Sequence, residues 1–511
     1  MRTRIANAWA LWAILAAQLA LTLPWLWRTA PFTDEALYLQ AGHQELAHWL
    51  HHAPVADYAG WFSGSPGIYP PLAAAADSLG GLVAARAISL VVMLATTALV
   101  YLIGERLLGH LAGVLGALVF AVCGLVVHYG AFATFGPPAL FLLVLAAWLA
   151  VKSADGGIGW LAGCAVALLA ANATKYATLA WDPAIAAILL LASWDKGKAL
   201  AIGRTASLAA TVGVLDLGLL MLGGADYNRG VVITTIFRSI HWGIANSSAS
   251  VLLRALALTG VLVVPALIGV LVSLASREPA ARTLLLCVLV LAAVVAPLEQ
   301  ARIHQLPSLD KNMGFGLPFA ALGTGYALSK GRQWLSEHHA WGPIAATAGI
   351  VALTIAALVA GRVQKIQFRG PGIAVATKLV AAIKRDYLPR SYIISDGAAR
   401  MEQYYLPGIS SQRWIGSFTP GAAQRAMITG RICSGEVSVV VLRLTGKTYD
   451  HAYDRTILAL LRTSHRYRLA TTAGQGNYTT QVWMLDRRAR ALADRARDPA
   501  ASAGSKVRGC Q

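Results

Sequence analysis

The stretch VLLRALALTGVLVVPALIGVLVSL, residues 251–274, is apolar along almost its whole length. A helix that crosses the hydrocarbon core of a bilayer needs roughly 20 mostly apolar residues, and this stretch supplies them without a break. The whole chain is 57% hydrophobic and only 13% charged, far from the composition of a soluble globular protein. The stretch is therefore predicted to be one membrane-spanning helix of a polytopic protein.

Apolar runs of this kind recur through residues 1–361, and they predict about eleven spans. The runs occupy residues 8–27, 82–103, 111–127, 139–151, 158–171, 177–192, 206–222, 251–274, 284–297, 315–329 and 344–360. The first follows Arg2 and Arg4 and resembles a secretion signal, but it is too long for one and lacks a clear cleavage site. We predict that it stays in the protein as a signal-anchor span.

The distribution of Lys and Arg predicts the orientation, because positive charge is retained in cytoplasmic loops. With the N-terminus inside, the cytoplasmic segments hold Arg2, Arg4, Arg106, Lys152, Lys196, Lys198, Arg204, Arg277, Arg282, Lys330 and Arg332. The short outer loops hold only Lys175, Arg229, Arg238, Arg302 and Lys311, and the long loop 29–81 has no Lys or Arg at all. We therefore predict a multi-pass membrane protein with its N-terminus on the cytoplasmic side and with this loop and the C-terminal part outside.

The net charge of +19 does not indicate a nucleic-acid partner. Its largest local contribution is the basic tail 487–511, which is predicted to be disordered. Basic residues close to a bilayer indicate contact with anionic lipid headgroups. Cys433 and Cys510 are both predicted to lie outside, where a disulfide is chemically permitted, and the sequence does not decide whether they pair.

The composition changes after about residue 362. Helical periodicity appears in residues 375–388, 398–406, 421–432 and 454–467, and strand patterns appear in residues 391–395, 436–444 and 478–486. We predict a membrane module over 1–361, which includes the loop 29–81, followed by an extracytoplasmic α/β domain over 362–486. This domain contains no phosphate loop, nucleophile motif or metal-ligand cluster, so a capping, stabilising or recognition role is predicted for it rather than chemistry.

The first outer loop begins TAPFTDEALYLQ, residues 29–40, with two neighbouring carboxylates, Asp34 and Glu35. Thr33 could cap a helix whose first turn carries both acids, a position that the helix macrodipole favours. Neighbouring helical residues point about 100° apart, so the two carboxylates cannot serve one atom equally. We expect one of them to face a pocket and the other to anchor the loop or a second ligand.

Two further features mark this loop. One helical face would carry Asp34, Tyr38, Glu45, His48 and His52. The last three could hold a metal, or they could form the polar face of a helix that lies among lipid headgroups. The segment GIYPPLAAA, residues 67–75, places two prolines before the second span, which is typical of a rigid turn.

An acidic pair after the first span, an outer loop that ends in an aromatic-Pro-Pro segment, and many spans before an outer domain together resemble the GT-C polyprenyl-phosphate-dependent glycosyltransferases. The pattern is most similar to the family of protein O-mannosyltransferases and the bacterial lipid A aminoarabinose transferase. Two more stretches fit, NATKYATLAWDP at 172–183 and EQARIHQLPSLDKNMGFGLPFAALGTGYAL at 299–328. The resemblance covers the membrane part, to about residue 360.

The resemblance implies a GT-C-like bundle that moves a sugar, with inversion, from a polyprenyl phosphate to a hydroxyl of a glycan, lipid or protein on the outer face. A hydroxyl is a poor nucleophile, so a carboxylate that accepts its proton favours the reaction. In the family, the Asp of the acidic pair does this, which carries over to Asp34. Glu35 matches the accompanying acid, with a structural or acceptor-orienting role.

The lipid phosphate that leaves gathers negative charge, so the site needs fixed cations near the outer surface. The donor-phosphate candidates are Lys175, Arg302, His304 and Lys311, each of which could instead be an ordinary interfacial cation. Tyr38 and Tyr69 are candidates for the sugar or acceptor pocket, with packing as the alternative for Tyr69. No metal site is predicted, and dependence on a divalent metal stays open.

Two departures from the family pattern stand out. Many relatives have an acidic residue near the start of the fourth span, where this chain has Thr134. Asp182 and Asp216 are carboxylates inside predicted spans, and such residues are costly unless they are paired or functional. Asp216 is the feature that favours the main alternative, a transporter or lipid flippase, although no internal repeat supports it. A non-catalytic scaffold would leave the first-loop carboxylates without a task. The sugar, the acceptor and the oligomeric state are not decided by the sequence.

Overall fold

The computed structural model describes residues 2–236, 246–306, 308–363, 371–395, 399–417, 421–443, 451–475 and 478–486. The chain divides into two compact units. The first, here named the membrane unit, consists of Met1–Leu26 and Ala41–Gln367, and the second, the sheet unit, consists of Trp27–Gln40 and Phe368–Gln511. The predictions made for Arg238, for the tail 487–511 and for the Cys433–Cys510 pair fall wholly or partly outside the described residues.

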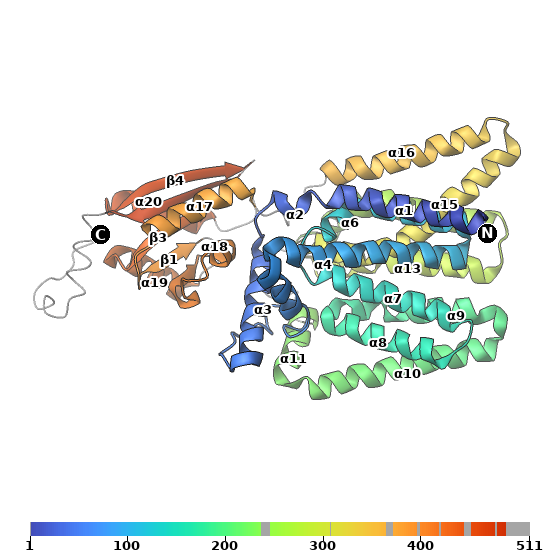
Figure 1. The fold of residues 1–511 in the computed structure, drawn as a ribbon, viewed down its shortest axis with the longest axis horizontal. Coiled ribbons are helices and arrows are strands. Elements are labelled where there is room, and N and C mark those ends of the chain that lie inside the picture. Colours follow the sequence, from blue (N-terminus) through green and yellow to red (C-terminus); the bar gives the residue numbers. More distant parts are fainter. Residues whose placement is uncertain are drawn as a thin grey trace, which may run out of the picture. The chain divides into compact units, whose positions relative to one another are not determined.

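The membrane unit is built from helices (Figure 1). In chain order the helices that lie wholly or partly in it are α1 (Arg2–Thr22), α2 (Trp25–Arg28), α3 (Thr33–His51), α4 (Tyr69–Leu108), α5 (His110–Val122), α6 (Gly124–Tyr129), α7 (Gly136–Ser153), α8 (Ile158–Thr174), η1 (Tyr176–Trp181), α9 (Asp182–Ser193), η2 (Trp194–Lys196), α10 (Lys198–Leu222), α11 (Gly224–Val231), η3 (Val232–Ile236), α12 (Ser248–Ala275), α13 (Ala280–Arg302), α14 (Leu309–Met313), η4 (Gly314–Gly316), α15 (Leu317–His338) and α16 (Gly342–Val363).

Each of the predicted apolar runs falls on one or two of these helices; the runs 8–27 and 111–127, for example, cover α1 with α2 and α5 with α6. In the part of the chain that the structure describes, 8 helical segments are long and apolar enough to cross a membrane, and His110–Val122 and Ile158–Thr174 are shorter apolar helices. Helix α15 begins apolar, but its second half carries Lys330, Arg332 and Glu337. The prediction of a polytopic helical membrane protein is confirmed.

Small residues let these helices approach closely, as is usual where no hydrophobic gain drives helices together inside a membrane. A Cβ built on Gly116 of α5 would lie 2.9 Å from the Ala321 carbonyl oxygen of α15, and one on Gly104 of α4 would lie 2.7 Å from the Cα of Gly113. Helices α4, α5 and α15 therefore pack backbone against backbone.

Helix α4 is broken at Gly80 and Gly81, whose backbone angles are not helical. Gly81 has φ 67°, which favours a residue without a side chain. The prolines of the 67–75 segment lie in the first turn of α4, where their missing amide hydrogen costs no intrahelical bond. The predicted rigid turn is therefore the start of a helix, and Pro70 packs directly against Gly42 of α3.

The sheet unit is an α/β domain, as predicted. Its strands are β1 (Tyr392–Ser395), β2 (Trp414–Gly416), β3 (Val437–Arg443), β4 (Tyr467–Gln475) and β5 (Tyr478–Leu485), and its other elements are α17 (Ile373–Asp386), α18 (Ala399–Tyr405), η5 (Ser411–Arg413), α19 (Ala422–Ser434) and α20 (His451–Thr463). The sheet has the order β2-β1-β3-β5-β4. Strand β1 is parallel to β2 and β3, and β5 is antiparallel to β3 and β4.

Both faces of this sheet are covered, because alternate residues of β3 point to opposite sides. Val439 and Val441 pack with Leu379 and Ile383 of α17. Val440 and Leu442 pack with residues of α19 and α20. Successive residues of β3 therefore pack against opposite layers, which explains the continuous apolar run from Val439 to Leu442.

The first outer loop is divided between the two units, whereas we predicted that 29–81 belongs to the membrane module. Ala30 lies in the core beside α17, and its amide donates to the Pro371 carbonyl oxygen at 2.8 Å. Arg400 Nη1 donates to Gln40 Oε1 at 3.1 Å. Such contacts join residues far apart in the chain, so a boundary drawn from composition misses them.

Candidate functional site

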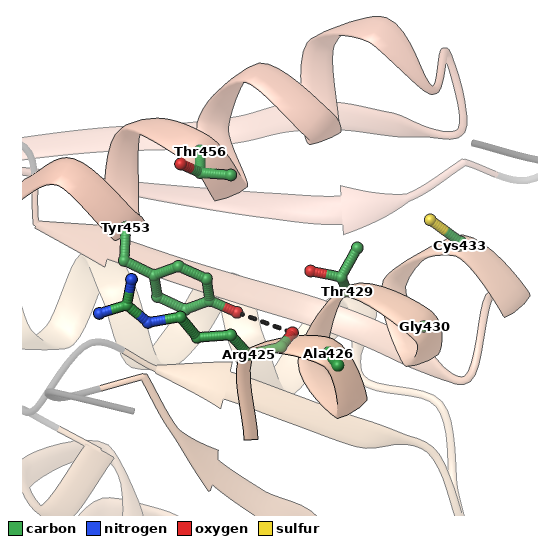
Figure 2. Close-up of a pocket in the computed structure, with 7 residues that line it drawn as sticks. All are labelled: Arg425, Ala426, Thr429, Gly430, Cys433, Tyr453 and Thr456. Carbon is green, nitrogen blue, oxygen red and sulfur yellow. Dashed lines mark hydrogen bonds between the residues drawn. The ribbon is translucent and has the colours of Figure 1, made fainter. Parts of the chain in front are cut away.

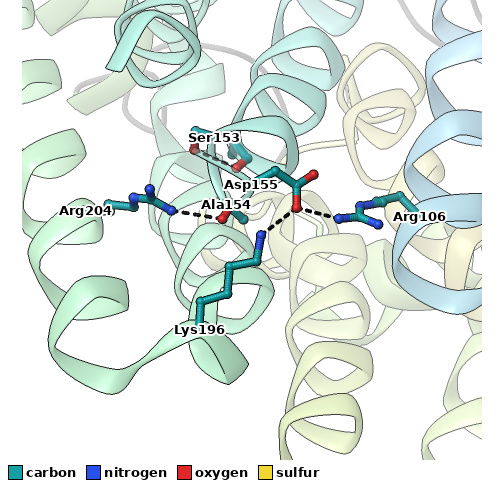
Figure 3. A network of polar contacts seen from close by, with 7 residues as sticks. Arg106, Ser153, Ala154, Asp155, Lys196 and Arg204 are labelled. Atoms are coloured by element: carbon teal, nitrogen blue, oxygen red, sulfur yellow. Dashed lines mark hydrogen bonds and ion pairs between the residues drawn. The ribbon is translucent and has the colours of Figure 1, made fainter. Parts of the chain in front are cut away.

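One end of the membrane unit gathers charges that the sequence predicts to be cytoplasmic (Figure 3). Asp155, which follows α7, bonds both Arg106 of α4 and Lys196, the latter at 2.6 Å. These bonds lower the pKa of the Asp155 carboxyl, with the Lys196 contact as the largest cause. Glu278 likewise bonds Lys330 at 2.5 Å and Arg282 at 2.7 Å. The segments assigned to one side of the bilayer thus meet through their side chains.

The loops predicted to be outside meet in the same way. The Ser65 amide donates to the Ala173 carbonyl oxygen at 3.1 Å, and the Tyr176 amide donates to the Ser63 carbonyl oxygen at 3.0 Å. Arg229 Nη2 lies 2.7 Å from Asp57 Oδ1. The second half of the first loop therefore packs against the end of α8 and against η1 and α11, which follow α8 and α10 in the chain.

Lys175 and Lys311, two of the predicted phosphate ligands, come together at this outer end. Lys175 follows α8 in extended conformation and is only 4% exposed. Its Nζ donates to the Lys311 carbonyl oxygen at 3.4 Å and lies 4.9 Å from the centre of the Phe315 ring. The structure thus unites residues that are widely separated in the sequence.

Lys311 lies on the short helix α14, between α13 and α15. Its side chain keeps partial exposure, but desolvation of the ammonium by the surrounding protein lowers its pKa to about 7. Burial disfavours the charged form of a lysine, and an arriving anion restores it. A bound anion would therefore raise the pKa of Lys311 again.

Tyr129 of α6 supports this segment, and the sequence reasoning missed it. Its hydroxyl donates to the Lys311 carbonyl oxygen, and its ring lies so close to Gly314 that a Cβ there would overlap it. Burial raises the pKa of Tyr129, so its hydroxyl keeps its proton as a donor. Gly314 of the NMGFG segment was a usable signal, since glycine is often found where a close approach to the backbone leaves no room for a side chain.

Arg302 and His304, the other two predicted phosphate ligands, are exposed. Arg302 forms a bidentate pair with Glu299, three residues earlier, at 2.8 and 2.6 Å. This pairing raises the pKa of Arg302. His304 has φ 55°, and its Nδ1 lies 3.0 Å from the Asn246 carbonyl oxygen.

The acidic pair belongs to the sheet unit, at the first turn of α3. Glu35 is fully buried, and its Oε2 accepts a bond from the Phe32 amide at 3.3 Å. An acid at this position caps the start of the helix. Asp34 is half-buried, and the Tyr38 hydroxyl lies 3.5 Å from its Oδ2. The helix begins at Thr33, so Thr33 is its first residue rather than the residue before it.

Tyr69, the second pocket candidate, is 1% exposed. Its ring packs against Phe135 with the ring centres 5.4 Å apart. Glu45, His48 and His52, the metal alternative, do not converge, and no group of three or more His, Cys, Asp or Glu side chains in the described residues could hold a metal ion. His48 Nδ1 instead lies 2.8 Å from the Ala53 carbonyl oxygen.

Arg86 is a second residue that the sequence reasoning missed. It is 0% exposed inside α4, donates to the Leu26 carbonyl oxygen at 2.9 Å and lies 5.4 Å from the centre of the Phe132 ring. A charged residue inside an apolar span is costly and usually functional, so the run 82–103 itself contained the signal.

The sheet unit has a shallow surface pocket between α19 and α20 (Figure 2). Arg425 stacks over the Tyr453 ring at 5.1 Å, and the Tyr453 hydroxyl donates to the Arg425 carbonyl oxygen at 3.3 Å. The lining is completed by Ala426, Thr429, Gly430, Cys433 and Thr456. We assign no chemistry to it.

The fold of this chain is similar to those of several solved membrane proteins. The Archaeoglobus fulgidus oligosaccharyltransferase in the apo form superposes with a TM-score of 0.63 and 12% identity, over 92% of this chain and 80% of that one. ArnT from Cupriavidus metallidurans bound to undecaprenyl phosphate gives a TM-score of 0.59 and 13% identity, over 93% and 98%. The chain has the fold of the GT-C glycosyltransferases. The mycobacterial arabinofuranosyltransferase AftD shares it with a TM-score of 0.50 and 14% identity, over 95% of this chain and 40% of AftD.

The sequence comparisons agree with this GT-C fold. A family model described as dolichyl-phosphate-mannose-protein mannosyltransferase matches residues 76–215, from α4 to α10. No curated protein sequence matches the chain. The matched stretch contains Arg86, Tyr129 and Lys175. The resemblance to GT-C enzymes is confirmed, and the predicted class of enzyme, a glycosyltransferase, is supported by both kinds of comparison.

Proposed function

We propose that this chain is an inverting glycosyltransferase that moves a sugar from a polyprenyl-phosphate donor to a hydroxyl acceptor on the outer face of the cytoplasmic membrane. The observation that carries the proposal is the hydrogen bond from the Lys175 ammonium to the Lys311 carbonyl oxygen, which brings these two lysines together at the predicted outer end of the membrane unit. The Archaeoglobus fulgidus oligosaccharyltransferase has been solved with a dolichol-phosphate and Cupriavidus metallidurans ArnT with undecaprenyl phosphate, which supports a lipid-linked donor.

In the proposed step, the acceptor oxygen attacks the anomeric carbon of the sugar. The bond between that carbon and the phosphate oxygen breaks, and its electron pair leaves with the polyprenyl phosphate. Attack from the opposite face inverts the configuration. The departing phosphate gains charge, and ammonium groups withdrawn from water stabilise this charge more strongly than exposed ones do. Lys175 and Lys311 fill this role, with Arg302 and His304 as more exposed ligands for the headgroup.

The acceptor proton passes to Asp34. An ionised carboxylate takes the proton as the new bond forms, which contributes typically 10²–10⁴-fold. Tyr38, which bonds Asp34, orients the carboxylate or the acceptor. Glu35 is engaged as a helix cap, so its proposed role is structural. The acceptor is a glycan, lipid or protein, and Tyr69 shapes the sugar pocket through packing.

The test uses the full chain in lipid nanodiscs, with mannose, arabinose and aminoarabinose linked to undecaprenyl phosphate and with cell-envelope extract as the acceptor source. Release of undecaprenyl phosphate is measured. Asp34→Asn should reduce the release at least about 10²-fold, because the general base is lost. The matched control is Asp226→Asn, an exposed carboxylate that pairs with Arg229. Turnover of Asp34→Asn at the wild-type rate would remove Asp34 from the mechanism.

A further inference from the structure

The carboxylates of Asp182 and Asp216, which the sequence left without a partner, meet at one amide group. Asp182 begins α9 and Asp216 lies in the second half of α10. Asn172 of α8 donates from Nδ2 to Asp182 Oδ2 at 3.0 Å and to Asp216 Oδ2 at 3.2 Å. One amide therefore joins three helices.

The hydrogen bonds leave this amide a single orientation. The Asn172 side chain is 2% exposed, and its two Nδ2 hydrogens are used by one carboxylate each. Its Oδ1 accepts a bond from Thr178 Oγ1 at 2.8 Å. Rotation of the amide by half a turn would point Oδ1 at two carboxylates, so the acids fix the direction in which Oδ1 faces Thr178.

Thr178 links the Asn172 amide to the backbone of Lys175. Its Oγ1 lies 2.9 Å from the Lys175 carbonyl oxygen as well, and its backbone amide donates to the same oxygen at 2.9 Å. Residues 172–178 thus form a turn whose two ends are tied by the Asn172–Thr178 bond. Lys175 lies at the middle of this turn.

We infer that Asn172 is a positioning residue for Lys175. Asp182 and Asp216 orient the Asn172 amide, the amide holds Thr178, and the closed turn fixes the point from which the Lys175 ammonium reaches Lys311 and Phe315. The inference rests on the proposed function, in which Lys175 binds the lipid phosphate. It also gives Asp216 a task that requires no transported ion.

The experiment measures binding of undecaprenyl phosphate and of undecaprenol, which lacks the phosphate, to the full chain in nanodiscs. Asn172→Ala should weaken binding of the phosphate by about tenfold, and Asp216→Asn by about threefold, within the range found for residues that act through a neighbour. Binding of undecaprenol should not change, because this lipid carries no phosphate for the ammonium to bind. A purely structural defect would lower both affinities together.

A conservative pair keeps the test independent of folding. Thr178→Ser retains the hydroxyl and should bind undecaprenyl phosphate as the wild type does, whereas Thr178→Val retains the shape and should lose affinity as Asn172→Ala does. Asp195→Asn, an exposed carboxylate ahead of α10, serves as the control for charge. Equal affinities of the Thr178 variants for the phosphate, or parallel losses for both lipids, would overturn the inference.

Lys175→Met separates the inference from the proposed function. If this variant keeps full affinity for undecaprenyl phosphate, the assignment of Lys175 as a phosphate ligand fails, and the inference fails with it. If Lys175→Met loses affinity while Asn172→Ala and Thr178→Val keep it, the proposed ligand stands and only the positioning network is wrong.

Discussion

At one end of the membrane unit Asp155 forms ion pairs with Arg106 and Lys196 at an exposed surface. At the other end Lys175 is buried, and it contacts the Lys311 carbonyl oxygen and the Phe315 ring. Exposed pairs are screened by water and salt and add little free energy. A buried ammonium interacts strongly with any anion that reaches it. Lysine therefore has two uses in this unit: Lys196 forms an exposed ion pair that links segments of the chain, whereas Lys175 is a candidate ligand for an anion.

The largest expected effect separates the two ends directly. Lys175→Met and Lys311→Met should each lower kcat/KM for the polyprenyl-phosphate donor by about 10²-fold, the usual cost of losing one group that stabilises charge in the transition state. Lys196→Met, at the other end, should leave kcat/KM unchanged. Steady-state kinetics over a range of donor concentrations measure both, and equal losses at the two ends would refute the comparison.

The pH dependence of donor binding tests the role of Lys311 at the outer end. The pKa of Lys311 is about 7 in the free protein because desolvation disfavours the ammonium form, and a bound phosphate raises it. Affinity for a sugar-phosphate donor should therefore be highest below pH 7 and fall, by at most tenfold per pH unit, as the pH rises above it. Lys311→Arg should flatten this profile, because arginine stays charged.

Folding stability should change in the opposite sense over the same range. The folded pKa of Lys311 lies below its ordinary value of 10.5, so between pH 7 and that value the unfolded chain binds more protons. The free energy of unfolding should therefore rise with pH there. Thermal unfolding of the wild type and Lys311→Met across this range checks the sign, and a fall in stability specific to the wild type would contradict the lowered pKa.

A smaller effect is expected from Gly314→Ala. The added methyl group overlaps the Tyr129 ring, so that ring must leave its place and its bond to the Lys311 carbonyl oxygen is lost. Overpacking of this kind costs typically about 1–3 kcal/mol. Gly331→Ala on α15, where a Cβ meets open space, is the control and should not destabilise the protein. Unfolding temperatures in nanodiscs measure both variants.

The smallest effect belongs to Asp155→Asn. The pair is exposed, so its loss should cost less than about 1 kcal/mol and should vanish in high salt. Since Lys196 and Arg106 lower the pKa of Asp155, its contribution is present above the ordinary carboxyl pKa and is lost as the pH falls through the lowered one. A large loss that persists in high salt would show that this network is more than a surface tie.

The fold was readable from local patterns. The apolar runs locate the helices between α1 and α16 apart from α3, α11 and α14, and the alternation of helix and strand patterns locates α17 to α20, β1, β3 and β5. Strands β2 and β4 were missed, because three residues carry no periodicity and YRLATTAGQ alternates poorly. The sequence supports a class of fold, but it does not reveal an edge strand that is very short, as β2 is, or one whose apolar and polar residues do not alternate, as in β4.

The candidate site was readable only in part. Lys175 and Lys311 were identified by residue type and predicted sidedness, and the structure adds that they meet. Arg302 was identified in the same way, and the structure adds that it forms an ion pair with Glu299, a contact that the spacing of three residues already allowed. The tasks of Asn172 and Tyr129 arise from contacts across helices, which no local pattern encodes.

Helix α10 has few buried side chains, and they are Ala201, Leu208 and Val212. When a helix packs against protein in a membrane, it replaces contacts with lipid tails by contacts that are equally apolar, so it gains little hydrophobic free energy. Close packing and a few hydrogen bonds must therefore hold it in place. Preparations stripped of lipid by detergent should therefore lose order at α10 first, visible as early amide hydrogen exchange along residues 198–222. The activity measured for a preparation would then depend on how much lipid was removed during purification.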